Sequence, residues 1–173
     1  MKSTKNRISL VMILLVCSSP LYGQTANEKY ADDVISISAI IDAYYDVISG
    51  SSQDPWQYER DKYIHSENAV ITRLDENGDA QSHSLEAEYI PLALSPKEDF
   101  YEIELKREVS HFGNMAQVWS AFEIRTDPNI ASEIRGLNSI QLYFANGRWW
   151  IDSWTTEMET DTNSLVANFM MKD

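Results

Sequence analysis

Apolar residues recur every three or four positions early in the chain, and this spacing predicts a helix over residues 33–49. The apolar stripe consists of Val34, Ile37, Ile41, Tyr44 and Ile48, and Gly50 follows where a left-handed helix end is favoured. A second helix is expected to begin at Asp54, because Pro55 suits a first helical position and Gln57 completes a capping box. A third, short helix is expected over residues 84–94.

Alternating apolar and polar residues dominate the second half, where two hairpins are predicted. Gly113-Asn114 suits a two-residue turn between strands 101–112 and 115–125, and Asn146-Gly147 suits a type I′ turn between strands 137–145 and 148–156. An earlier strand is expected over residues 69–74. Helices followed by long strands predict a single α+β domain.

A two-residue turn fixes which residues lie opposite each other, so the faces of both hairpins are predictable. In the first hairpin Ile103, Leu105 and Val109 fall on a core face, and Arg107 lies on that face opposite Ser120. In the second hairpin the expected pairs are Ile140 with Ser153 and Asn138 with Thr155. The other face carries Tyr143 opposite Trp150, and Ser139 opposite Trp154.

Arg107 is the informative position, because a charge on a core face must be paired or must line a wet cavity. One interpretation is a ligand pocket lined by polar residues of this face: Arg107, Ser120, Asn138, Ser153 and Thr155. The other, which we favour, is an ion pair with a helix carboxylate such as Asp42 or Asp46.

Three further residues are pocket candidates, each with a structural alternative. Tyr44 lies on the apolar stripe, where core packing with a satisfied hydroxyl is the more common role. His65 follows the second helix and suits a capping or surface position as well as a cavity mouth. Arg73 lies in the first strand.

The first 23 residues are typical of a secretory signal peptide. Lys2, Lys5 and Arg7 precede an apolar run over residues 8–17, which is shorter than the roughly 20 residues of a membrane-spanning helix. The expected organisation is a signal peptide at 1–23, one domain at 24–156 and a tail at 157–173 that is either a docking helix or a frayed end. A secreted or periplasmic location follows, and a short membrane anchor is the alternative. The sole cysteine, Cys17, would leave with the signal.

Charge restricts the partners. The net charge of −13 becomes −16 once the three basic residues of the signal are removed. Such a chain repels phosphate backbones and anionic lipid heads, so neither nucleic acid nor a membrane is expected as a partner after signal cleavage. His65, His83 and His111 lack metal-ligand spacing, and no cofactor motif is present, so neither a metal nor a cofactor is expected.

Several segments in the same order resemble the nuclear transport factor 2-like (SnoaL-like) superfamily, in particular an uncharacterised bacterial exported branch. They are residues 44–50, 54–56, 112–116, 135–142 and 147–151. The resemblance implies a cystatin-like cone, in which a strongly bent mixed sheet wraps around three N-terminal helices and encloses a cavity. It also implies a homodimer through the outer sheet face, where Tyr143, Trp150 and Trp154 are expected.

The superfamily includes ketosteroid isomerase and scytalone dehydratase as well as binders without catalytic activity. The base of the isomerase falls at or near Arg73 here, and arginine accepts no proton at neutral pH. The expected function is therefore non-catalytic binding of a small, partly apolar ligand in the cone. The alternatives are a lyase or isomerase that acts on a small organic substrate, and a homodimeric structural or interaction module.

Overall fold

The computed structural model describes residues 26–54, 56–88, 98–132 and 134–171 of the chain. The expected signal peptide lies outside these residues. Within the described ranges no helix is long and apolar enough to cross a membrane.

The first predicted helix is two elements, the 3-10 helix η1 (Ala26–Val34) and the α-helix α1 (Ile37–Ile48). The break occurs because Ser36 takes the N-cap, where its hydroxyl accepts a hydrogen bond from the Ala39 amide at 3.1 Å. The second helix, α2 (Tyr58–Ile64), begins later than expected. Asp54 does not cap it, because its carboxylate accepts hydrogen bonds from Ser51 instead. Of the third predicted helix, only residues 85–88 are described, and they are helical.

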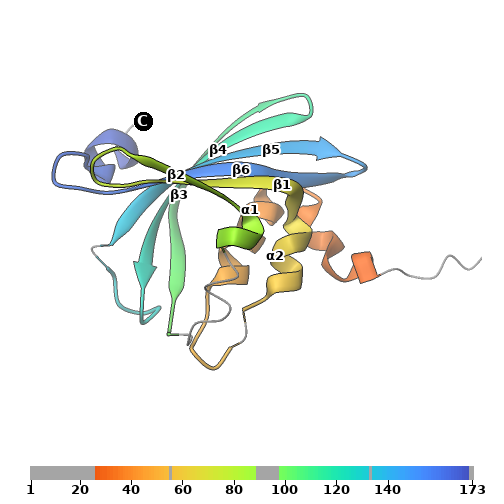
Figure 1. The fold of residues 1–173 in the computed structure, drawn as a ribbon, viewed down its shortest axis with the longest axis horizontal. Coiled ribbons are helices and arrows are strands. Elements are labelled where there is room, and N and C mark those ends of the chain that lie inside the picture. Colours follow the sequence, from red (N-terminus) through yellow and green to blue (C-terminus); the bar gives the residue numbers. More distant parts are fainter. Residues whose placement is uncertain (1–25, 55, 89–97, 133, 172–173) are drawn as a thin grey trace, which may run out of the picture.

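Six strands form one mixed sheet in the order β2-β1-β6-β5-β4-β3. They are β1 (His65–Leu74), β2 (Ala80–Ser84), β3 (Tyr101–Phe112), β4 (Met115–Arg125), β5 (Arg135–Ala145) and β6 (Arg148–Met158). β1 runs parallel to β6, and the remaining pairs are antiparallel. Figure 1 shows the sheet strongly bent, with α1 and α2 against its concave side, here called the inner face.

Both predicted hairpin turns are confirmed. Asn146 and Gly147 both have positive φ, of 54° and 80°, as a type I′ turn requires. At the other turn only the first central residue, Gly113, has positive φ, which fits a type II′ turn. Near the turns the pairs are those that two-residue turns require, and they include the expected pairs Arg107 with Ser120 and Tyr143 with Trp150.

A β-bulge at Leu105 overturns the predicted face of the first half of β3. Lys106 lies opposite Ala121, but Glu104 already lies opposite Phe122, so Leu105 is the extra residue. Because strand side chains alternate, one extra residue exchanges the two faces beyond it. Leu105 therefore packs on the outer face, while Glu102 and Glu104 point to the inner face.

A second bulge, at Asp152, has the same effect on β6. Leu142 lies opposite Ile151, whereas Gln141 lies opposite Ser153 and Asn138 lies opposite Thr156. The expected pairs Ile140–Ser153 and Asn138–Thr155 are therefore wrong. Trp154, expected on the outer face, belongs to the inner core with 3% of its surface exposed.

The inner face packs its apolar side chains against the helices. Fully buried members include Ile40, Ile41 and Val47 of α1, Ile64 of α2, and Ile71, Val118, Phe122, Ile140 and Ile151 of the sheet. Each such side chain contributes about 1.5–3 kcal/mol relative to an exposed one. This packing holds α1 across the concave sheet, directly beside the polar residues described below.

The C-terminal tail docks on the outer face. Its π-helix η2 (Val166–Met170) buries Phe169, together with the preceding Leu165, against Ala121. Lys106 donates a hydrogen bond from Nζ to the Phe169 carbonyl at 3.0 Å. Of the two states left open by the sequence, the structure has the docked one.

Candidate functional site

Arg107 is held by carboxylates on both sides. Its Nη2 lies 2.7 Å from Oδ1 of Asp42 in α1 and 2.6 Å from Oε2 of Glu104 in β3. The favoured interpretation, an ion pair with a helix carboxylate, is confirmed for Asp42, whereas Asp46 pairs with Arg60. Burial lowers the pKa of Arg107, but the two carboxylates outweigh this effect and raise it overall.

A chain of hydrogen bonds continues from this ion pair into the core. The Ser120 hydroxyl donates to the Glu104 carboxylate, so the Tyr45 hydroxyl donates to Ser120 Oγ at 2.7 Å. Ser120 is fully buried and Tyr45 is 7% exposed. Burial is the main reason that the pKa of Tyr45 is raised, and the nearby Glu102 raises it further. The Tyr45 phenol is therefore a donor across the physiological pH range.

Glu102 lies beside this chain and has few partners. Asn138, which is fully buried, donates from Nδ2 to Glu102 Oε1 at 3.2 Å. The amide oxygen of Asn138 in turn accepts from the Thr156 hydroxyl at 2.5 Å. That bond fixes the orientation of the amide and presents its NH2 group to the carboxyl group.

The Glu102 carboxyl group is surrounded by protein although solvent still reaches part of the residue. Desolvation raises its pKa from 4.5 to about 7, while the Asn138 hydrogen bond and the charge of Arg73 act in the opposite direction. Glu102 is therefore a partly buried residue of the inner face whose carboxyl group is desolvated. With a pKa near neutrality it can donate or accept a proton.

The predicted pocket residues fall into two groups. Arg107, Ser120 and Asn138 lie together on the inner face, as the register predicted. Ser153 and Thr155 lie on the outer face, because the bulge at Asp152 reverses their direction. There Ser153 donates a hydrogen bond to Gln141 Oε1 at 2.8 Å. Thr156, which the prediction passed over, takes the inner position next to Asn138.

Tyr44 and His65 are core residues, with exposed fractions of 3% and 2%. Tyr44 packs edge-to-face against Trp154 with ring centroids 5.5 Å apart, as its structural alternative predicted. His65 Nδ1 donates to the Asp61 backbone carbonyl of α2 at 2.7 Å, which is the capping role considered above. The Asp61 carboxylate, also fully buried, lies 3.2 Å from the same nitrogen.

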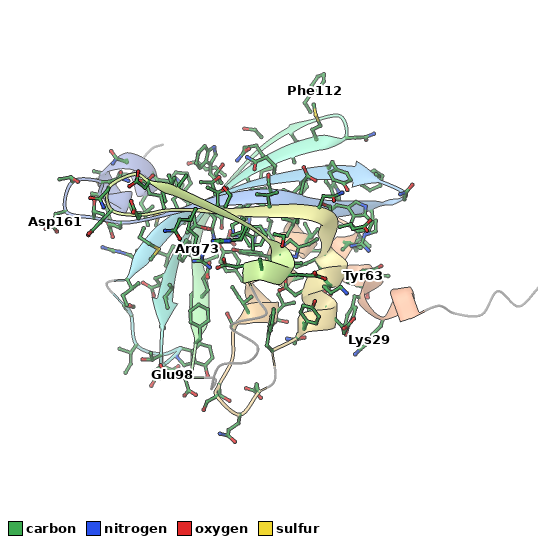
Figure 2. All side chains as sticks on the ribbon, viewed as in Figure 1. Lys29, Tyr63, Arg73, Glu98, Phe112 and Asp161 are labelled. Atoms are coloured by element: carbon green, nitrogen blue, oxygen red, sulfur yellow. The ribbon has the colours of Figure 1, made fainter. Side chains whose placement is uncertain are left out.

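Arg73 lies on the inner face, since it is opposite Thr156 in the parallel β1–β6 pair. Its side chain is 54% exposed, and its Nε donates to Glu88 Oε1 at 2.7 Å. Figure 2 marks its place in β1. Arg73 is thus a cation on the same face as Glu102 and is paired with Glu88, while Arg107 is paired with two carboxylates.

Sequence reasoning missed Glu102, Glu104, Tyr45 and Thr156. Alternation in Tyr101-Glu102-Ile103-Glu104 fits either face of a strand, so the pattern alone could not decide which side faces inward. The buried Asn138 opposite a core strand was the available signal, because a buried amide requires polar partners on neighbouring strands.

The outer face differs from the surface expected for a dimer. Trp154 is absent from it, and Tyr143 and Trp150 remain, with their rings stacked at a centroid distance of 6.5 Å. Between them and the docked tail runs a polar ladder, in which Gln141 donates to Gln117 at 2.6 Å and Gln117 donates to Ser139 at 2.8 Å.

No family model matches the chain, and no curated protein matches it in sequence. Solved structures do resemble it. A nuclear transport factor 2-like protein of unknown function from Shewanella baltica superimposes with a TM-score of 0.54 at 12% identity, covering 79% of this chain and 98% of that one. A cystatin-like protein of unknown function from Nostoc punctiforme gives 0.56 at 11% identity, covering 79% and 95%.

A third solved structure is a proposed dehydratase of the nuclear transport factor 2-like family from Streptomyces avermitilis. It gives a TM-score of 0.56 at 12% identity, covering 74% of this chain and 96% of that one. These similarities agree with the bent mixed sheet and the helices on its concave side. The chain therefore has the nuclear transport factor 2-like, cystatin-like cone fold.

Proposed function

We propose that this protein is exported and binds a small, partly apolar molecule in the recess beside Glu102. The observation that carries the proposal is a carboxyl group desolvated enough for a pKa of about 7, in a residue of the inner face that is only partly buried. A ligand there would meet a carboxyl group that can donate or accept a hydrogen bond. Nearby aromatic rings, including Tyr44 and Trp154, make the surroundings apolar.

The polar groups around Glu102 are already oriented. Asn138 is fixed by Thr156, and the Tyr45 hydroxyl is fixed by Ser120. Because these groups are preorganised, a ligand loses less free energy in ordering them when it binds. Arg73 adds a cation at the same side of the sheet, which favours a ligand with a partial negative charge such as a carbonyl oxygen.

The test is a screen of small organic compounds by ligand-observed NMR, followed by mapping of each hit on the labelled protein. Hits should shift the signals of Glu102, Asn138 and Thr156, and the Glu102→Leu variant should no longer bind these hits. Glu108→Gln is the matched control, since Glu108 lies on the outer face of the same strand. Hits that map elsewhere, or that bind Glu102→Leu unchanged, would contradict the proposal.

Catalysis is the second candidate, and the near-neutral pKa of Glu102 favours it. A carboxyl group that exchanges protons near pH 7 suits a lyase or isomerase, in which a proton leaves carbon and another returns. Arg73 would stabilise the developing anion, because its side chain is 54% exposed and has one carboxylate partner, Glu88. Tyr44 and His65 are buried, and Arg107 is held by two carboxylates. A substrate found in the screen should then show a rate that changes near pH 7 and is lost in Glu102→Gln.

Two further expectations stay proposals. Export rests on the residue pattern over 1–23, and N-terminal sequencing of the protein recovered from the periplasm or medium should begin near Gly23 or Gln24. A homodimer through the outer face now rests on Tyr143 and Trp150 without Trp154. Light scattering should then give twice the chain mass, and replacing both aromatic residues should halve it.

A further inference from the structure

A hollow lies outside the cone, where η1, α2 and the start of β6 meet. Its volume is about 450 Å³, within the range of small-molecule sites. Three cations line it, Lys29, Lys62 and Arg148, together with the rings of Tyr63 and Trp150. Figure 2 shows Lys29 and Tyr63 at the same end of the molecule. Tyr30 and Glu59 complete the lining.

These three cations share a property that sets them apart in so acidic a chain. Every other lysine or arginine among the described residues forms an ion pair with a carboxylate: Arg60, Arg73, Lys106, Arg107, Arg125 and Arg135. Within the same ranges, Lys29, Lys62 and Arg148 have no such partner. Among the residues that the structure describes, the positive charge without a carboxylate partner is therefore gathered in one hollow, where Glu59 is the sole lining carboxylate.

Arg148 is also held rigidly. Its guanidinium lies 3.8 Å from the ring centroid of Tyr63 and 3.8 Å from that of Trp150, and it donates to the Tyr63 backbone carbonyl. Among the described residues, Nε donates to the Trp149 carbonyl and Nη2 donates to the Tyr63 carbonyl, so the Nη1 edge of the guanidinium is its route to a ligand. Arginine stays charged at every physiological pH, so this edge is a permanent donor.

The lining chemistry defines the ligand class. Three cations against one carboxylate favour a single negative charge, and the aromatic side chains of Tyr30, Tyr63 and Trp150 add apolar surface to the lining. Tyr30 and Tyr63 lie side by side, with centroids 5.7 Å apart. We propose that this hollow is a binding site for a small aromatic carboxylate, separate from the recess inside the cone.

The test uses the purified protein and 2-naphthoate as the probe, with binding measured by calorimetry at low salt. Binding is expected for 2-naphthoate and about tenfold weaker binding for its neutral counterpart, 2-naphthol, because the alcohol lacks the charge. Raising the salt to about 0.5 M should weaken 2-naphthoate binding and leave 2-naphthol unchanged. Equal affinity for the two probes would overturn the proposal.

Variants locate the site. The double variant Lys29→Gln/Lys62→Gln changes two exposed side chains and should weaken 2-naphthoate binding about three- to tenfold. Arg148→Gln should weaken it at least as much. Lys106→Gln, which removes a cation paired with Glu108 on another surface, is the matched control and should leave binding unchanged.

Two outcomes remain, and each overturns the proposal. Unchanged affinity in the double variant would place the probe elsewhere. The second outcome is that 2-naphthoate fails to bind while the protein binds vesicles of phosphatidylglycerol but not of phosphatidylcholine, and the double variant loses this vesicle binding. It would identify Lys29, Lys62 and Arg148 as a contact for lipid headgroups. Glu102→Leu should not affect 2-naphthoate binding, so failure of the cone proposal and failure of this one are distinguishable.

Discussion

Asn138 in β5 donates a hydrogen bond to Glu102 in β3 at 3.2 Å, although β4 lies between these two strands. The contact crosses the concave side of the sheet, where strong bending brings the side chains of non-adjacent strands together. It exists because the bulge at Leu105 turns Glu102 inward. This one hydrogen bond gives a polar partner both to the buried amide of Asn138 and to the desolvated carboxyl group of Glu102.

Stability should fall as the pH rises toward neutrality, because of Glu102. Its pKa is raised from 4.5 to about 7 on folding, so the folded chain binds more protons than the unfolded chain between these values. The contribution is fully present below about pH 4.5 and is lost as the pH rises through 7, by up to about 3 kcal/mol. Urea unfolding at several pH values should show this fall and a flatter profile in Glu102→Gln. Carbon NMR that places the Glu102 titration near 4.5 would contradict it.

Removing Arg107 should cost far more than removing its exposed partner. Arg107→Gln leaves the partly buried Glu104 without its cation, and we expect a loss of about 2–3 kcal/mol in unfolding free energy. Asp42 is 66% exposed, so Asp42→Asn should cost under about 1 kcal/mol. Urea unfolding of both variants measures the difference. Equal losses would show that the Asp42 contact, rather than Glu104, dominates the role of Arg107.

Gly136 is required by close packing rather than by its backbone angles. A Cβ at this position would lie 2.7 Å from Phe122 Cζ and 2.9 Å from the Glu157 carbonyl oxygen. Gly136→Ala should therefore lower the unfolding free energy by about 1–3 kcal/mol. In a chain that already carries Phe122→Leu, the loss caused by Gly136→Ala should be smaller, because the aromatic ring that the new Cβ would contact is gone. Strictly additive losses would argue against the contact.

The docked tail should contribute measurably to stability. Phe169 is 7% exposed against Ala121, and Phe169→Ala is expected to cost about 2–4 kcal/mol. Val166 lies in the same turn but is 38% exposed, so Val166→Ala is the matched control, with a loss under about 1 kcal/mol. Thermal unfolding followed by circular dichroism compares the two. A tail that is released in solution would give equally small losses.

Much of the fold could be predicted because it rests on local chemistry. Gly113-Asn114 and Asn146-Gly147 place both turns, and the register holds from each turn as far as Lys106–Ala121 and Leu142–Ile151. The apolar stripe of α1 was also recognisable. The helix starts were less predictable: Ser36 caps α1 after the expected start at residue 33, and Asp54, expected to cap the second helix, accepts hydrogen bonds from Ser51 instead.

The sequence by itself determined five of the six strands, the two hairpin turns and a cation on the inner face, whereas β2 was not predicted. Tertiary structure alone decided which residues share that face beyond each bulge. An extra residue at Leu105 or Asp152 leaves no local signature, and it is favoured because the bent sheet can then bury Trp154 against Tyr44 and pair Glu102 with Asn138. Side chains alternate along a strand, so the extra residue in β6 put Trp154 and Thr156 on the inner face in place of Ser153 and Thr155. The extra residue in β3 turned the carboxylates of Glu102 and Glu104 inward.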